Sequence, residues 1–148
     1  MKMDISKFKH SIKRRVRTYE VDYQGIVHNS NYLRYFEDGR IEYRRNLNST
    51  LTSSGFFTDG TKIVVVHNSI DYFSPSYLDE ELEIFTRISW IKNSSFCFEN
   101  IIIVRDKLIC NGKGILVNIN YDDIPENLPE LAIKQIKEFE GDNLEIRQ

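Results

Sequence analysis

The chain has 148 residues, the size of one ordinary domain and enough to bury a core without disulfide or metal support. Its 20 basic and 22 acidic residues give a net charge of -2, so no global field favours nucleic acid or an acidic membrane surface. No uncharged apolar run approaches the roughly 20 residues of a membrane span, and the amino terminus has no signal-peptide core. We therefore expect one soluble, cytoplasmic domain over residues 1–148.

The cysteine content excludes a disulfide framework. Cys97 and Cys110 are the only cysteines, and each lies in an apolar, strand-like run without a second Cys or His at metal-ligand spacing. Buried free thiols are predicted, which suit a reducing compartment, and no metal or cofactor is expected.

The first elements in chain order are a basic lead, a strand and a turn. The lead covers about residues 1–12, and the β-branched and aromatic content of "KRRVRTYEV" predicts a strand from about Lys13 to Glu20. Asp22 and Gly25 then provide turn chemistry.

A change of hydrophobic period marks a helix of about four turns from Tyr32. Leu33, Phe36, Arg40 and Tyr43 recur at three-to-four spacing, and Tyr32, Tyr35, Ile41 and Leu47 widen this stripe. Ser30 or Asn31 fits the N-cap position. Gly39 in the helix interior suggests that another backbone passes close by.

Most of the remaining chain is predicted to be strand. The expected strands are Lys62–Phe73, Glu81–Ile91, Ser95–Arg105 and Leu108–Tyr121, and short turns separate them. Short connections indicate antiparallel hairpins rather than crossovers. An amphipathic helix over about residues 125–140, closed by Gly141, and a frayed tail complete the chain.

This element order predicts an α+β fold in which an antiparallel sheet covers one long, mostly buried helix. A single sheet wrapped on one helix leaves an edge or a face available to a second copy. We therefore expect a homo-oligomer, either a homodimer or a dimer of dimers that forms a homotetramer.

A candidate site lies where the turn meets the start of the helix. The first turn of a helix carries unpaired N–H groups and the positive end of the macrodipole, so Asn29, Ser30 and Asn31 could stabilise a developing oxyanion. Asp22 could then act as general base or nucleophile on an acyl group. The alternative is an ordinary Asx-turn, for which Asp-x-x-Gly is also a signature.

The three histidines differ in whether a catalytic role is expected for them. His28 could be a general acid or base, or only a partner for the turn backbone. His10 falls in the basic lead, and His67 falls in the middle of a strand, where a structural role is expected.

The stretch "DYQGIVHNSNYLRYFEDGRIEYRR" resembles the signature of the 4-hydroxybenzoyl-CoA thioesterase-like branch of the hot-dog thioesterases. The later segments "VVVHNSIDYFSPSYLDEELEIFTRI" and "GKGILVNIN" are similar to this family's strands, and together these matches cover most of Arg15 to Tyr121. The resemblance implies the hot-dog fold, an antiparallel sheet wrapped around one long central α-helix in an oligomer.

The resemblance also implies an acyl-CoA thioesterase, a hydrolase that releases free acid and CoA. Asp22 corresponds to the carboxylate that attacks the thioester or activates water, and Asn29 to the position whose backbone N–H polarises the carbonyl. His28 has a weaker assisting role, because relatives often carry histidine at the position of Asn29. Gly25, Asn31 and Tyr32 are expected to contact substrate.

Several alternatives stay open at this point. The substrate could be delivered by an acyl carrier protein instead of CoA, or the chain could be a non-catalytic acyl-ligand binding protein on the same fold. A hot-dog dehydratase is disfavoured, because no acid on the helix pairs with a histidine. The aromatic residues of the helix could line an acyl pocket or belong to the core.

Overall fold

The computed structural model describes residues 4–148, so the first three residues of the expected basic lead lie outside it. In chain order the elements are β1 (His10–Arg15), α1 (Asn31–Asn46), β2 (Ile63–Tyr72), β3 (Glu81–Ile91), β4 (Ser95–Val104), β5 (Lys107–Asn118), α2 (Glu130–Glu140) and β6 (Glu145–Ile146). None of the helices in these residues is both long and apolar enough to cross a membrane.

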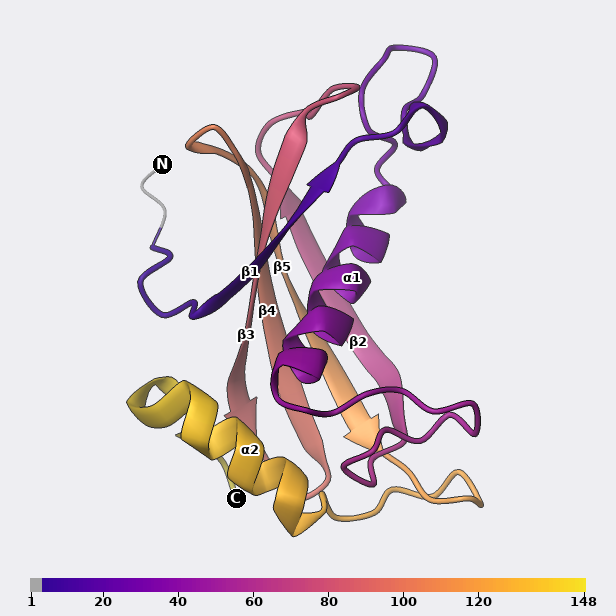
Figure 1. The fold of residues 1–148 in the computed structure, drawn as a ribbon, viewed down its shortest axis with the longest axis vertical. Coiled ribbons are helices and arrows are strands. Elements are labelled where there is room, and N and C mark those ends of the chain that lie inside the picture. Colours follow the sequence, from indigo (N-terminus) through magenta and orange to yellow (C-terminus); the bar gives the residue numbers. More distant parts are fainter. Residues whose placement is uncertain (1–3) are drawn as a thin grey trace.

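The sheet has the strand order β1-β3-β4-β5-β2, and all of these neighbours are antiparallel. Figure 1 shows α1 lying across one face of this sheet, which confirms the predicted α+β layer arrangement. The hairpin expected between β2 and β3 is wrong, because β2 pairs with β5 at the far edge. Residues 73–80 instead cross over the start of α1, where Ser76 O accepts the Val27 N–H at 2.9 Å.

The buried face of α1 forms the centre of the core. Its N-terminal half, including Tyr35 and Phe36, packs in one apolar cluster with β3, β4 and β5. Tyr43 belongs to a second cluster, which α2 closes through Ile136. Tyr32, Tyr35, Phe36 and Tyr43 are all buried, so the aromatic stripe is core. Leu33, expected on this stripe, is exposed instead.

The first strand differs from the sequence-based expectation at both ends. β1 begins at His10, inside the predicted lead, and pairs with β3 in the register His10↔Thr86 to Arg15↔Glu81. Thr18–Glu20 is a 3₁₀ turn, in which the Glu20 carboxylate accepts the Arg17 N–H at 2.8 Å. This local side-chain hydrogen bond replaces a sheet partner and ends the strand early.

Gly39 does mark a close approach, but the neighbours are side chains and not a backbone. A Cβ at Gly39 would lie 2.5 Å from Thr86 Oγ1 and 3.0 Å from Ile84 Cγ2 of β3. The glycine therefore lets α1 settle directly on the sheet.

The carboxyl end is more ordered than the expected frayed tail. α2 ends at Glu140 and is capped by Gly141, which has a φ of 60°. This confirms the predicted C-terminal helix and its closing glycine, although the helix begins at Glu130 and not near residue 125. The chain then forms β6, which pairs in parallel with Trp90 and Ile91 of β3. A two-residue strand carries no detectable period, so the sequence does not reveal it.

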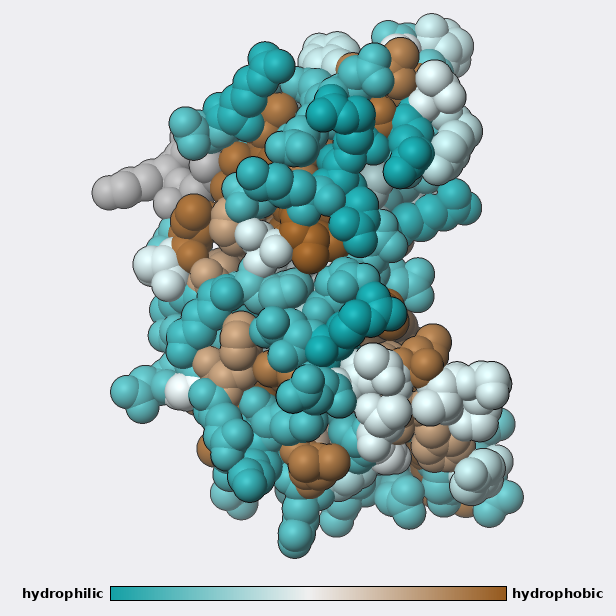
Figure 2. Space-filling model, in the orientation of Figure 1, coloured by the Kyte–Doolittle hydropathy of each residue, from teal (hydrophilic) through white to brown (hydrophobic). Residues whose placement is uncertain are grey.

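The outer edge of β2 is a free sheet edge, since no strand of residues 4–148 pairs with it. Its apolar side chains are exposed, among them Val64, Val65 and Val66. Figure 2 shows that hydrophobic residues form separate patches among hydrophilic ones on the face seen in Figure 1. A free apolar edge is a pairing surface for another chain.

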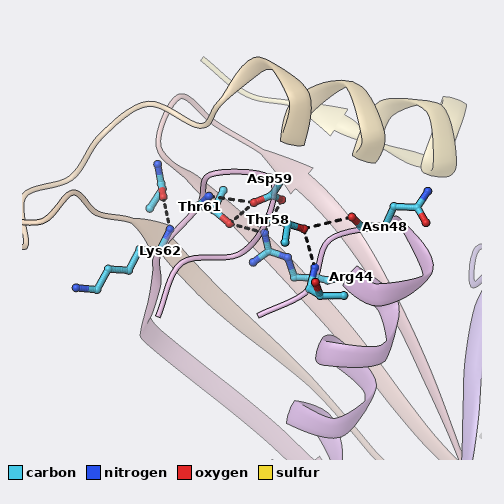
Figure 3. A network of polar contacts seen from close by, with 8 residues as sticks. Arg44, Asn48, Thr58, Asp59, Thr61 and Lys62 are labelled. Carbon is cyan, nitrogen blue, oxygen red and sulfur yellow. Dashed lines mark hydrogen bonds and ion pairs between the residues drawn. The ribbon is translucent and has the colours of Figure 1, made fainter. Parts of the chain in front are cut away.

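The segment that joins α1 to β2, residues 47–62, is held against the C-terminal end of α1 by a buried ion pair (Figure 3). Arg44 Nη2 lies 2.7 Å from Asp59 Oδ2, and it also donates to Thr61 Oγ1. Phe57 adds its ring face, 3.8 Å from the Arg44 guanidinium carbon. This cluster positions one wall of the cavity described below.

Candidate active site

The Asp22 turn lies at the N-terminal end of α1. The Asp22 N–H donates to Ile26 O at 2.8 Å, and the Gly25 N–H donates back to Asp22 O at 3.0 Å. Gly25 has a φ of 80°, a conformation that favours glycine. The Asp22 carboxylate accepts the Gln24 N–H at 2.7 Å and is half-buried. An Asx-turn is therefore present, as the alternative interpretation required, and it leaves the second carboxylate oxygen available.

A short ladder connects this turn to the start of the helix. Val21 and Val27 form an antiparallel bridge, and the His28 N–H donates to Glu20 O at 2.9 Å. The structure thus brings the Asp22 turn and the segment 28–31 to the same end of α1, because the ladder closes the loop between them.

The helix begins without a side-chain N-cap from Ser30. His28 takes over part of that role, since its Nδ1 accepts the Ser30 N–H at 3.2 Å and lies 2.8 Å from Ser30 Oγ. Nδ1 is therefore an acceptor, and in the neutral ring the proton resides on Nε2. This geometry fits the turn-partner role that the sequence left open for His28.

The Asn29 amide N–H has no hydrogen-bond acceptor among the described residues. Its carbonyl is engaged, because it accepts the Tyr32 N–H at 3.4 Å and a hydrogen bond from Tyr72 Oη at 3.4 Å. The unpaired donor therefore stands at the positive end of the α1 dipole, where an anionic oxygen is favoured.

Asn31 and Tyr32 are both engaged within the fold. The Asn31 side chain is buried and donates to Glu20 O at 2.8 Å, which ties the helix to the 3₁₀ turn. Tyr32 is 4% exposed, and its hydroxyl lies 2.7 Å from Ser76 Oγ. Both residues position the helix start. Gly25, by contrast, has no atom within 4 Å of the position that a Cβ would occupy.

The other two histidines lie away from this end. His10 is half-buried in β1, and its ring meets Tyr43 edge-on at 5.8 Å. Burial lowers the pKa of His10 below its ordinary value. His67 is exposed on β2, next to a bulge in its pairing with β5.

Sequence reasoning did not assign the segment 72–77 to the site. Tyr72 and Ser76 contact the helix start directly, through Asn29 O and Tyr32 Oη. The only signal in the sequence is the "SPS" turn, which predicts a change of direction but not its position above α1.

With this geometry in view, comparison with known proteins decides the family. The sequence profile described as "Thioesterase-like superfamily" matches residues 16–139. The chain belongs to this superfamily. Its hot-dog architecture confirms the resemblance seen in the sequence.

Two named proteins are similar to this chain over most of its length. A protein of Aquifex aeolicus named "Putative esterase" is 34% identical over 122 residues, which is 80% of this chain and 94% of that protein. The Escherichia coli protein "Acyl-CoA thioester hydrolase YbgC" is 26% identical over 128 residues, which is 83% of this chain and 93% of that protein.

A solved member of the superfamily supports the same fold. The thioesterase of Thermus thermophilus, crystallised with coenzyme A and Zn, superposes with a TM-score of 0.78 at 26% identity. The match covers 91% of this chain and 96% of that chain.

Proposed function

We propose that the chain hydrolyses an acyl-CoA thioester to the free acid and CoA. The observation that carries this proposal is that the Val21–Val27 bridge brings the Asp22 turn and the unpaired Asn29 N–H to the same end of α1. The names of the relatives, an esterase and an acyl-CoA thioester hydrolase, support the same reaction class.

The two groups supply complementary parts of the chemistry. Asp22 attacks the thioester carbon, or takes a proton from the water that does so, and the Asn29 N–H stabilises the oxyanion that develops. Collapse of the tetrahedral intermediate breaks the C–S bond, and the CoA thiolate leaves. If water attacks, the product is the free acid; if Asp22 attacks, the product is an anhydride with Asp22, which water then hydrolyses to the free acid and the regenerated carboxylate. Because a thiolate is a good leaving group, a strong general acid is not required, which is consistent with a His28 ring engaged with Ser30.

The proposal includes association of two copies along β2. The free β2 edge carries exposed apolar side chains, and antiparallel pairing with a second β2 would satisfy its backbone groups. The segment around Asp22 lies at the molecular surface. In the proposed oligomer a neighbouring subunit covers this segment and encloses the acyl group. Dimer or tetramer formation is measurable by sedimentation.

The test is thiol release from short, long and aromatic acyl-CoAs, compared between the wild type and Asp22→Asn. Asparagine can still accept the Gln24 N–H, so the turn should persist while the base or nucleophile is lost. We expect kcat/KM to fall by roughly 10²- to 10⁴-fold with little change in Tm. Equal activity of the variant would exclude Asp22 chemistry.

The delivery of the acyl group is a separate question that the same assay resolves. If acyl-CoAs are inert and an acylated carrier protein is hydrolysed, the carrier is the substrate. If neither is hydrolysed but acyl-CoA binds tightly, the non-catalytic alternative holds.

A further inference from the structure

A cavity of about 400 Å³ lies between α1, β2 and the segment 47–62. Its apolar lining includes Leu33, Ile41, Leu51, Phe57, Val65 and Leu116. The lining runs from Leu33 to Arg44 on α1, about 16 Å of helix axis at ~1.5 Å per residue. This volume and shape are those of a site for a small, elongated ligand.

The cavity contains a buried arginine whose charge has no anionic partner. Arg40 is 7% exposed, and no carboxylate of residues 4–148 lies within ion-pair distance of it. Its hydrogen-bond acceptors are two neutral amide oxygens, Asn100 Oδ1 at 3.1 Å and Asn68 Oδ1 at 3.5 Å, and its Nη2 has none. Buried cations normally have a carboxylate partner, because desolvating an unpaired charge is costly.

Arg44, the next buried arginine on α1, has the carboxylate partner that Arg40 lacks. Arg44, one helical turn further along, is equally buried and has the Asp59 carboxylate at 2.7 Å. Glu37 is the only acidic residue in the cavity lining; it is exposed and forms no ion pair with Arg40. Because Asp59 neutralises Arg44, Arg34 and Arg40 face a single Glu37, and the lining keeps a net positive charge.

The guanidinium of Arg40 is held in place by the sheet and does not move freely. A Cβ at Gly114 of β5 would lie 2.5 to 2.7 Å from its Nη2, Cζ and Nη1 atoms. The Phe36 and Phe98 rings pack around it, at 5.9 and 5.6 Å from Cζ. Burial lowers the pKa of Arg40 to about 10, so it remains a cation at neutral pH.

We propose that this cavity binds an apolar chain that ends in a carboxylate, with the carboxylate on the Arg40 guanidinium and the chain along the apolar walls. Nη1 donates to Asn68, which lines the cavity. At 3.5 Å this is the longer of the two hydrogen bonds that Arg40 forms. A carboxylate can replace that weak contact with a charge-assisted one. The carboxylate could belong to a free fatty acid or to the far end of a dicarboxylic acyl thioester.

The first measurement is calorimetric titration of the full chain with decanoate and with 1-decanol, which match in chain length and differ in charge. We expect decanoate to bind with a Kd on the order of 10- to 100-fold below that of decanol. Equal affinity of the two ligands, or no binding of decanoate, would overturn the proposal.

Variants locate the site. Arg40→Gln should remove the preference for decanoate, but its burial puts folding at risk. Leu51→Asp is therefore the second variant, since Leu51 lines the cavity at 53% exposure, away from the β2 edge, and the new charge repels a carboxylate. Ser53→Asp is its matched control, as Ser53 is exposed in the same segment and lies outside the lining. Equal loss of binding in both variants would contradict the proposed location.

The source of the carboxylate is distinguished by hydrolysis. If the carboxylate is the distal end of the substrate, the mono-CoA thioester of decanedioic acid should have a lower KM than decanoyl-CoA, and Leu51→Asp should abolish this difference. Equal KM values assign a free acid. This second arm rests on the proposed function, whereas decanoate binding does not. Asp22→Asn should bind decanoate like the wild type. A wild type that binds decanoate but hydrolyses no acyl-CoA would refute only the proposed function.

Discussion

The two ends of α1 are built in opposite ways. At the N-terminal end, His28, Asn29 and Ser30 are exposed, and apart from the Tyr72 Oη contact to Asn29 O their hydrogen bonds are to nearby residues such as Glu20 and Tyr32. In the C-terminal half, Arg40, Tyr43 and Arg44 are buried. Their polar partners lie far away in sequence, on the sheet, α2 and the segment 47–62.

This difference separates two tasks that one helix performs. The buried polar groups of the C-terminal half fix the position of α1, because each would be costly to leave unpaired. The N-terminal end can then keep a backbone donor unpaired at the surface for use in binding. We therefore expect substitutions in the C-terminal half to change stability, and substitutions at the N-terminal end to change activity.

The largest stability effect is expected for Arg44→Met, which leaves the Asp59 carboxylate buried without its cation. Breaking such a pair should lower the free energy of unfolding by about 3–5 kcal/mol, measured in urea. The adjacent Arg45→Met is the matched control, because its ion pair with Glu42 is solvent-exposed and should matter by less than about 1 kcal/mol. Similar losses in both variants would contradict the buried cluster.

Gly114→Ala should have the next largest effect, since its methyl group would meet the Arg40 guanidinium at 2.5 Å. Overpacking of this kind costs about 1–3 kcal/mol in the free energy of unfolding. Lys113→Ala, at the exposed neighbouring position of β5, should be close to neutral. A neutral Gly114→Ala would mean that Arg40 is not held against the sheet.

Glu140 of α2 provides a pH-dependent test of the contacts that hold the C-terminal half of α1, because it accepts a hydrogen bond from Tyr43. Its carboxylate is fully buried and accepts hydrogen bonds from Tyr43 Oη at 2.6 Å and the Ile88 N–H at 3.0 Å. Burial raises the pKa of Glu140 above its ordinary value of 4.5, despite these hydrogen bonds. The folded state therefore favours the protonated form, and stability is full below pH 4.5 and lost as pH rises toward the folded-state pKa.

Glu140→Gln removes this titration and keeps an acceptor for Tyr43. We expect the stability of the variant relative to the wild type to increase from pH 4 to pH 7, by about 1.4 kcal/mol per unit of pKa shift. Glu138→Gln, on the exposed face of α2, should show no such trend. Parallel pH profiles for the wild type and Glu140→Gln would contradict the raised pKa.

Asn29→Ala should have the smallest effect of all. The proposed oxyanion donor is the backbone N–H, which alanine retains, so the loss in kcat/KM should stay well below the roughly 10²- to 10³-fold of a removed donor. A loss as large as that of Asp22→Asn would instead assign the role to the Asn29 side chain.

The strong local patterns were predictable. The predicted strand Glu81–Ile91 has the same bounds as β3, because its alternating residues meet one buried face of the sheet. The buried free thiols Cys97 and Cys110 are confirmed for the same reason, since each lies in an apolar strand. Asp22, Gly25 and Asn29 were recognisable because they lie within one continuous segment.

Features that depend on distant partners were not predictable. Arg40 fell on the helical stripe in the sequence, but its lack of a carboxylate partner follows from where Asn68, Asn100 and Gly114 meet it. The crossover from β2 to β3 was missed because the sequence shows only that the connection is short. It does not show with which strand β2 pairs.

The sequence by itself determined the two helices, the four long strands β2 to β5, the family signature and the order of groups around the Asp22 turn. Local periodicity and turn chemistry act over a few residues and are therefore written directly in the chain. Only the tertiary structure decided the strand order, the free β2 edge and the cavity around Arg40. These arise from contacts between residues far apart in the sequence, where burial determines which charges find a partner and which do not.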